Sequence, residues 1–322
     1  MTKFTPLQYI KIAAANAFGL DKETWDKRIE WFDTIGVLNT PDIYEQAKEP
    51  ILLRKAINAY NDAINGIPTG YIMSLDATCS GLQIMACLIG CHDTAKAVNL
   101  IDTGKRENAY RIIADIVDSD EDTCKKPVMT YFYGSMAQPR AIFEDQLPLF
   151  LTAVNTILPG ANEIKNDIQS CWRTDVLANS WTLPDGHRAV VKNMEPVDKT
   201  IEIDELDHAT FTHRIYENME QDFSLSLPAN VVQSFDGYIV REMIRMAHSQ
   251  GFDIITIHDC FWCSPNHMQK LRENYVKILA DIASKNYLQD VLREIMDNPE
   301  LKFIKYSDDL GELIIKSEYA IC

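Results

Sequence analysis

Two aspartates, Asp76 and Asp259, each follow a short run of apolar and β-branched residues in this 322-residue chain. If the two runs form neighbouring strands, both carboxylates lie at the same end of one sheet. Carboxylate oxygens suit Mg²⁺, which completes its shell with water and substrate phosphates, and two such ions can clamp the attacking and leaving oxygens of a phosphoryl transfer. The pair alone is weak evidence, because an aspartate at a strand end often only forms a turn.

A lysine that could meet a triphosphate stands between the two aspartates in the sequence. Lys125, Met129 and Tyr133 are spaced four residues apart, so they share one face if the segment is helical. A lysine is a compact, mobile charge that can neutralise β- and γ-phosphate oxygens. By spacing alone, a surface lysine and a core tyrosine explain the pattern equally well. Pro127 complicates the helix, because an interior proline costs about 3 kcal/mol outside the first turn.

The apolar pattern predicts the elements that must hold these side chains. We expect strands over residues 71–76, 252–257, 260–263 and 312–315, and a hairpin over 181–191 around Pro184-Asp185-Gly186. We expect helices over residues 9–16, 24–32, 43–64 with Thr40 as the N-cap, 80–90 and 228–250, mixed helix over 141–180, and largely helix over 266–322.

Charge limits the partners that this surface can bind. The chain has 31 Lys and Arg against 47 Asp and Glu, a net charge of −16. This balance argues against broad binding of nucleic-acid phosphates, so any such partner needs a local basic site. Residues 196–222 are especially acidic, with only Lys199 and Arg214 as basic residues, and we expect them to form a solvated acidic face.

Cysteines and hydropathy indicate the compartment. Eight cysteines without a secretory signal predict free thiols in a reducing environment. We expect the spaced pairs Cys87/Cys91 and Cys260/Cys263 to be packing residues rather than zinc or redox sites. No apolar run reaches the ~18 residues of a membrane span, and the start lacks a signal peptide. We therefore expect an intracellular protein with no membrane partner.

Three ordered segments resemble motifs A, B and C of the single-subunit DNA-dependent RNA polymerases of phages and mitochondria. They are Leu75-Asp76-Ala77-Thr78-Cys79-Ser80-Gly81-Leu82-Gln83, Lys125-Lys126-Pro127-Val128-Met129-Thr130-Tyr131-Phe132-Tyr133-Gly134-Ser135, and Ile257-His258-Asp259. Residues 15–22, 97–100, 181–186 and 234–237 are also similar to family segments in their usual places. The resemblance spans nearly the whole chain, and the ordered set is far more specific than any single motif.

The resemblance implies a right-hand polymerase fold of the α/β (α+β) class, with a small antiparallel sheet in the palm and mainly helical fingers. Residues 1–75 would lead into the palm, 76–95 and 229–322 would form it, and 96–228 would form the fingers with a hairpin insertion. Family members are far longer, so we expect the N-terminal promoter domain and the thumb to be lacking here.

The resemblance also implies roles for single residues. Asp76 and Asp259, with the Ala77 carbonyl, would bind two Mg²⁺ ions; Lys125 would hold the triphosphate, and Tyr133 would lie against the new sugar and base. The other residues implied in substrate binding are Lys126, Gly134, Gln233 and His258. Gln233 stands where the family usually has a histidine, and its amide still offers a donor and an acceptor to a ribose hydroxyl.

Two positions depart from the family pattern. Glu121 stands four residues before Lys125, where the family carries an arginine that meets the triphosphate, and a carboxylate there would repel phosphate. We expect Lys126, Lys3 or a residue of another chain to supply the missing charge, unless the helix register differs. Ile84 replaces a histidine that is usual in motif A.

The implied reaction is attack of an RNA 3′-hydroxyl on the α-phosphate of an incoming ribonucleotide, templated by DNA. We expect this chain to be the catalytic subunit of a split, heterodimeric phage enzyme. We expect the enzyme to act in the cytoplasm of the infected cell. The implied partners are a more basic second subunit with the N-terminal and thumb elements, the DNA template, the RNA product, ribonucleoside triphosphates, and a single-stranded-DNA-binding or promoter-opening factor.

Three other functions fit parts of the sequence. A family A DNA polymerase shares the palm and the lysine–tyrosine helix, but its segments after the two aspartates differ from those found here. A decayed polymerase subunit that only scaffolds a partner is supported by Glu121. A His-Asp metal phosphohydrolase would need further His and Asp ligands on helices, whereas His258-Asp259 follows a β-type run.

Overall fold

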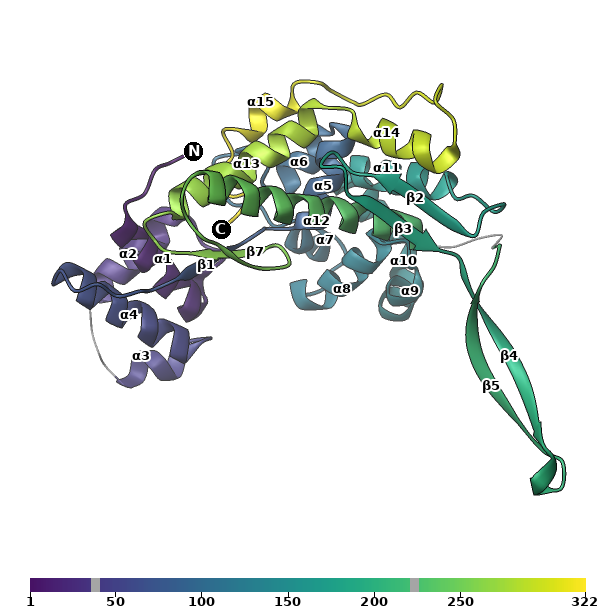
Figure 1. The fold of residues 1–322 in the computed structure, drawn as a ribbon. Coiled ribbons are helices and arrows are strands. Elements are labelled where there is room, and N and C mark those ends of the chain that lie inside the picture. Colours follow the sequence, from purple (N-terminus) through teal and green to yellow (C-terminus); the bar gives the residue numbers. More distant parts are fainter. Residues whose placement is uncertain (36–40, 221–225) are drawn as a thin grey trace.

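The computed structural model describes residues 1–35, 41–220 and 226–322, and these form a mixed α/β fold in which helices predominate (Figure 1). The α-helices are α1 (Pro6–Ala15), α2 (Trp25–Ile35), α3 (Pro41–Gln46), α4 (Pro50–Ile64), α5 (Ser80–Ile89), α6 (His92–Ala97), α7 (Ala109–Ile116), α8 (Glu121–Phe132), α9 (Ala137–Phe143), α10 (Leu147–Ile157), α11 (Pro159–Ser170), α12 (Ser226–Ser249), α13 (Met268–Ser284), α14 (Tyr287–Met296) and α15 (Leu310–Ile314). The strands are β1 (Met73–Asp76), β2 (Ala178–Thr182), β3 (Arg188–Lys192), β4 (Met194–Ile203), β5 (Ala209–Asn218), β6 (Ile255–Ile257) and β7 (Cys260–Cys263).

A small antiparallel sheet, in the order β1-β7-β6, lies at the centre of the molecule. Side chains alternate across β1, so Leu75 is buried while Ser74 and Asp76 line a cleft on the other face. Behind the sheet, Phe261 of β7 packs against Tyr275 of α13, with ring centroids 5.9 Å apart. One face of the sheet is therefore fixed by the core, and the other is free to present polar groups.

Helix α5 follows β1 directly and lies in the middle of the core. Its residues from Leu82 to Ile89 are all buried, and α6, α11, α12 and α13 pack around it. The buried amide of Gln83 donates to the carbonyls of Val98 and Ala320 at 3.0 and 2.9 Å and accepts from Tyr275 Oη at 2.8 Å. Because these buried polar atoms are satisfied, they fix α5 against the end of the chain instead of destabilising it.

The strand predicted over residues 312–315 is wrong, because this segment ends the short helix α15. Leu310 and Ile314, one helical turn apart, are buried. Gly311 lies so close to α13 that a Cβ at this position would be 2.1 Å from Ser284 Oγ. Packing on α13 therefore overrides the strand propensity of the isoleucines. Ile321 supplies the sheet contact instead, through a bridge to Ala77.

The single helix predicted over residues 43–64 is divided into α3 and α4. Pro50 begins α4 at a position where its missing N–H is not needed, and proline disfavours helix in the residue before it. Thr40, the predicted N-cap, lies outside the described residues. The other predicted helices and strands are confirmed, with bounds that shift by a few residues.

Two hairpins follow the helical middle of the chain. β2 and β3 pair around Pro184-Asp185-Gly186 as predicted, with Gly186 at φ 82°. The acidic segment forms a second hairpin, in which β4 pairs with β5 from Met194↔Asn218 to Ile203↔Ala209. This β4–β5 hairpin projects away from the rest of the molecule (Figure 1). The exposure of the acidic segment was predicted, but its pairing was not.

The eight cysteines are free thiols, as predicted. No helix among the described residues is long and apolar enough to span a membrane.

An ion pair fixes the β2–β3 turn on α12. Arg241 Nε donates to Asp185 Oδ2 at 2.5 Å, and a second guanidinium nitrogen donates to Oδ1 at 3.2 Å. The Asp185 side chain is only 3% exposed. The hydrogen bond from Arg241 lowers the pKa of Asp185. A carboxyl group with a lowered pKa contributes stability above its unfolded-state pKa and loses it as the pH falls through its folded-state pKa.

We expect Asp185→Asn to lower the free energy of unfolding at pH 7 by about 2 kcal/mol, because Arg241 loses its bidentate partner. The wild type loses the same contribution progressively below about pH 4, so the two proteins should converge in acid. Urea unfolding at pH 7 and pH 2 measures the difference. Asp175→Asn, which removes an exposed pair with Arg173, should change stability less. An equal difference between Asp185→Asn and wild type at both pH values would contradict this account.

Candidate active site

The sheet brings Asp76 and Asp259 together, as the sequence predicted. Asp76 is the last residue of β1 and pairs in register with Cys260, the residue after Asp259. The Ala77 N–H donates to the Asp259 carbonyl at 3.2 Å, which ties the segments after the two strands to each other. Asp259 lies in the tight turn between β6 and β7, where His258 has the positive φ of 54°. Both aspartates line one cleft of about 1140 Å³.

The electrostatics of Asp76 show an excess of negative charge at this point. Burial, followed by the charge of Asp259, raises the pKa of Asp76 to about 6, and Lys125 opposes the rise. Burial and a nearby like charge both disfavour the ionised carboxylate. The Asp76 carboxylate is therefore close enough to Asp259 and Lys125 for all three charges to interact.

Asp236 on α12 is a third carboxyl group near the pair, and the site prediction missed it. Burial, followed by the charge of Asp259, raises the pKa of Asp236 to about 6, while His258 lowers it. Asp236 belongs to the Ser234-Phe235-Asp236-Gly237 segment, which resembles the family, so the sequence carried a signal for it. The resemblance did not assign a role to Asp236, because the sequence does not show that α12 passes beside the β6–β7 turn.

Helix α8 places Lys125 on the cleft. Asp120 caps the helix by accepting from the Thr123 N–H at 2.8 Å, and Glu121 and Asp122 favour its first turn. Pro127 lies inside α8 and is buried, so packing outweighs the hydrogen bond that proline removes. Lys125 Nζ lies 5.9 Å from the centre of the Tyr110 ring, a cation–π contact that holds the ammonium group over the cleft.

Tyr133 ends α8 and reaches across to the start of α5. Its hydroxyl lies where the Gly81 side chain would be, since a Cβ on Gly81 would approach Tyr133 Oη to 2.7 Å. Burial raises the pKa of Tyr133 to about 12, with smaller contributions from Cys79, Asp236 and Asp259. The neutral phenol therefore lies in the same cluster as the carboxyl groups.

This contact gives a testable coupling between Gly81 and Tyr133. In the wild type, Gly81→Ala should destabilise, because the rigid ring must move, although alanine is favoured by about 1 kcal/mol in a helix. In a Tyr133→Phe background the nearest ring atom would be 3.4 Å away, an ordinary contact. We expect Gly81→Ala to be about 1–2 kcal/mol more favourable in that background, measured by urea unfolding of the four proteins. Equal effects in both backgrounds would contradict the contact.

The cleft gathers some of the predicted site residues and leaves others out. Asp76, Ala77, Asp259, Lys125 and Tyr133 line it. The substrate-binding residues that are not part of its lining are Lys126, Gly134, Gln233 and His258. Lys126 and Gln233 are exposed on α8 and α12, so the structure gives no contact that supports their predicted roles.

Glu121, the carboxylate expected to repel phosphate, is paired with a cation in the cleft. Lys22 Nζ lies 2.6 Å from Glu121 Oε1. Burial raises the pKa of Glu121, but hydrogen bonds from Lys22 and Asn108, with the charges of Lys22 and Arg106, outweigh it, so the pKa lies below its usual value. Both cations line the cleft, whereas Lys3, which we expected to supply the missing charge, does not.

Similarity to known proteins assigns the chain to a family. The family model described as DNA-dependent RNA polymerase matches residues 4–128 and 149–316. The chain belongs to the DNA-dependent RNA polymerase family. The match includes the segments around Asp76 and Asp259 and the first residues of the Lys125 segment, whereas residues 129–135 lie outside it; the match gives no support to the phosphohydrolase alternative.

Individual members of the polymerase family are similar to this chain at modest identity. A probable DNA-directed RNA polymerase of Neurospora crassa is 30% identical over 34% of this chain and 13% of its own length. The mitochondrial DNA-directed RNA polymerase 1B of Nicotiana tabacum is 24% identical over 92% of this chain and 36% of its own length. The DNA-directed RNA polymerase of Pseudomonas phage phiKMV is 27% identical over 40% of this chain and 21% of its own length. The chain thus spans about a third or less of these polymerases.

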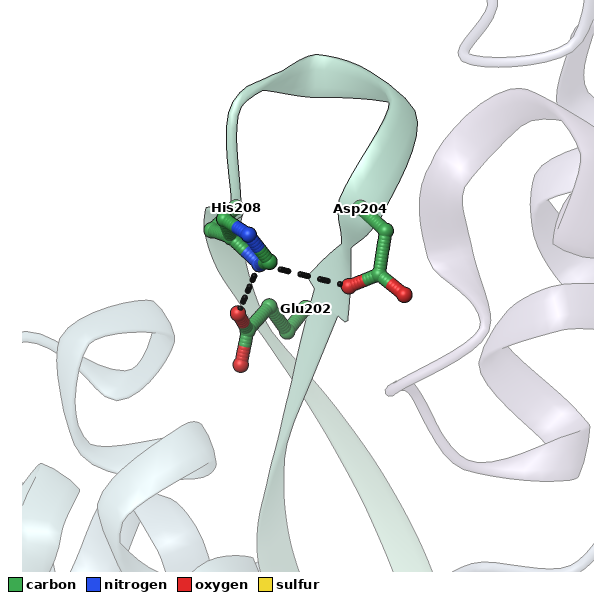
Figure 2. Close-up of side chains that lie close together, drawn as sticks. All are labelled: Glu202, Asp204 and His208. Atoms are coloured by element: carbon green, nitrogen blue, oxygen red, sulfur yellow. Dashed lines mark hydrogen bonds and ion pairs between the residues drawn. The ribbon is translucent and has the colours of Figure 1, made fainter.

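A group of three side chains outside the cleft has ligand atoms within 4.8 Å of one another, close enough to hold a metal ion. Among the described residues, Glu202, Asp204 and His208 meet this criterion, at the tip of the β4–β5 hairpin (Figure 2). His208 Nδ1 lies 2.6 Å from Glu202 and 3.4 Å from Asp204. All three side chains are exposed, and the pairing with His208 is enough to explain why the carboxylates gather there.

Proposed function

We propose that this chain carries the catalytic centre of a DNA-dependent RNA polymerase, which adds ribonucleotides to an RNA 3′ end. The observation that carries the proposal is the convergence of Asp76, Asp259 and Lys125 on one cleft in a chain of this family. Two carboxylates beside a cation fit a phosphoryl transfer, in which catalysis rests on positioning and on neutralising phosphate charge.

The residues of the cleft fit the divalent metal ions that polymerases generally use. Asp76 and Asp259 supply hard oxygen ligands, and burial together with the charge of Asp259 raises the pKa of Asp76, which a bound cation would offset. We propose that the bound metal is Mg²⁺, as two ions held by these carboxylates with the Ala77 carbonyl. When bound, the ions would stabilise charge on the reacting phosphate and activate the attacking hydroxyl.

The chain's own side chains would bind and orient the nucleotide. Lys125 would pair with triphosphate oxygens, from a helix face that Tyr110 helps to hold. Tyr133 would lie against the sugar and base, since its ring is fixed over Gly81 at the edge of the carboxyl cluster. The palm would be formed by residues 76–95 and 229–322 and the fingers by residues 96–228. Residues 1–75 would form the helical segment that precedes the palm. Comparing ribonucleotide with deoxyribonucleotide addition on a primed template separates this proposal from a DNA polymerase.

A basic partner completes the proposal. The net charge of −16 and the acidic β4–β5 hairpin do not favour a long contact with nucleic-acid phosphates. We propose that a second polymerase subunit brings the basic surface that holds the DNA template and the RNA product, with a single-stranded-DNA-binding or promoter-opening factor as a further partner.

The test is co-purification of the chain with the products of neighbouring genes, followed by runoff transcription with Mg²⁺. We expect templated RNA synthesis by the complex and its loss when the chain carries Asp259→Ala. Unchanged synthesis with Asp259→Ala would show that the chain only scaffolds an active partner. Full templated synthesis by the isolated chain would refute the second subunit but not the catalytic centre.

A further inference from the structure

Glu121 stands where the resemblance implies an arginine that binds the triphosphate. The other cations that line the cleft are therefore candidates for its role. At the head of α8, Lys22 is held by Glu121 at 2.6 Å. Across the cleft, Lys48 lies 3.9 Å from Asp21. These two lysines are therefore already partly neutralised by the protein. A triphosphate carries several negative charges, so Lys125 alone would leave most of them to the metal ions.

Lys55 on α4 and Arg106 on the loop before α7 also line the cleft, and of these two Arg106 is the one whose charge acts at the Glu121 position. Arg106 thereby shares the cleft with Lys125 and Asp76. Among the described residues, no carboxylate forms an ion pair with Arg106 or with Lys125. Arg106 is half-buried, so part of its guanidinium group is shielded from water. An arginine near the site that forms no ion pair with a described carboxylate is available to an anion.

The backbone around Arg106 is fixed independently of any ligand. The Asn99 side chain donates to the Glu107 carbonyl at 2.9 Å and accepts from the Glu107 N–H at 2.7 Å. Ser317 Oγ donates to the Asn99 carbonyl at 2.6 Å, which ties this loop to the end of the chain. Asn108 then caps α7 by accepting from the Arg111 N–H at 3.1 Å. Arg106 thus lies on a loop that is held on both sides.

The side chain is also anchored on the segment that pairs with the end of β1. Arg106 Nε donates to Cys322 Sγ at 3.3 Å. Cys322 in turn pairs with Asp76, its N–H donating to the Asp76 carbonyl at 2.9 Å. Because only Nε is engaged in this contact, the two terminal nitrogens keep their donors. A guanidinium group held in this way can present two parallel N–H groups to one phosphate.

We propose that Arg106 binds the triphosphate of the incoming nucleotide together with Lys125, and so replaces the cation that Glu121 displaces. This inference rests on the proposed function. Arg106 reaches the cleft from the loop before α7 rather than from α8, so the charge comes from a different element than the motif leads one to expect.

Binding measurements with a non-hydrolysable nucleoside triphosphate and with the matching monophosphate test this assignment. The full chain, with its co-purified partner, would be titrated in Mg²⁺ as wild type, Arg106→Ala and Arg106→Lys. We expect Arg106→Ala to weaken triphosphate binding about tenfold and monophosphate binding less than about twofold, because the lost contact is to the phosphate tail. Arg106→Lys should restore part of the loss. Lys105→Ala, an exposed neighbour paired with Glu107, is the matched control and should bind both nucleotides as wild type does.

Wild-type triphosphate affinity in Arg106→Ala would overturn the assignment. Equal losses for triphosphate and monophosphate, or an equal loss in Lys105→Ala, would also overturn it, because each would indicate a general effect. If the wild-type complex adds nucleotides in runoff transcription while Arg106→Ala binds triphosphate normally, the Arg106 assignment fails and the proposed function stands. If the wild type neither binds triphosphate nor adds nucleotides, both fail.

Discussion

Replacing Asp259 by asparagine is expected to slow templated nucleotide addition at least ~10³-fold, because metal neutralisation of a transferring phosphate is worth several kcal/mol. The asparagine keeps the shape of the side chain and removes its charge. The β6–β7 turn should persist, because its register depends on backbone pairing between Ile257 and Cys260. Single-nucleotide extension of a primed template by the purified complex measures the rate.

Asp253→Asn is the matched control for this prediction. It makes the same chemical change on an exposed residue shortly before β6, so it should leave the extension rate within about twofold of wild type. Thermal unfolding of both variants would confirm that they fold. Extension by Asp259→Asn at the rate of the control would contradict the role of Asp259 in catalysis.

Replacing Lys125 by methionine is expected to lower kcat/KM for the incoming nucleotide about 100-fold. A charge-assisted hydrogen bond to phosphate is worth about 1.5–3 kcal/mol, and methionine keeps the apolar stem without the charge. The stability of the fold should not change, since Lys125 forms no ion pair with another described residue. The loss should therefore be confined to nucleotide addition. Steady-state extension over a range of nucleotide concentrations measures it.

Lys126→Met tests the helix register in the same experiment. Lys126 is adjacent in sequence and exposed like Lys125, but it is not part of the cleft lining. We expect its kcat/KM to fall less than about threefold. Equal losses in the two variants would show that non-specific charge matters more than the position of Lys125, and a larger loss in Lys126→Met would mean that the register of α8 is misassigned.

The meeting of Asp76 and Asp259 could be predicted because two local patterns, weak alone, are supported by the resemblance of three ordered motifs. Each aspartate ends or follows a β-compatible run, and the alternation of side chains decides which face Asp76 takes. The helix that carries Lys125 was predicted for a similar reason, since its four-residue spacing and its resemblance to motif B lie within one segment.

The cationic side of the cleft could not be predicted in this way. Lys22 and Arg106 lie between helices and reach the site only through tertiary packing. Lys22 belongs to a segment that resembles the family, but neither position carries a pattern that assigns it a role in the site. Arg106 depends on Cys322, more than two hundred residues away. The same limit explains why Asp236 was missed, because its approach to Asp259 depends on where α12 crosses the sheet.

The two wrong predictions of secondary structure, the single helix over residues 43–64 and the strand over residues 312–315, have different physical causes. At Pro50 the signal for a helix start was present, and the long apolar spacing of residues 43–64 masked it. At residues 312–315 the local preference for strand was real, but Gly311 allows α15 to approach α13 closely, and the buried surface gained there decides the outcome.

Iron-mediated cleavage of the backbone tests most directly whether Asp76 and Asp259 form a metal site. Fe²⁺ would replace Mg²⁺ in the purified chain, and ascorbate with peroxide would generate radicals that cut the backbone near the bound ion. We predict cuts near residues 76 and 259 that excess Mg²⁺ suppresses and that Asp76→Asn with Asp259→Asn abolishes. Cuts confined to the hairpin tip around Glu202, Asp204 and His208, or cuts near residues 76 and 259 that persist in the double variant, would contradict the account.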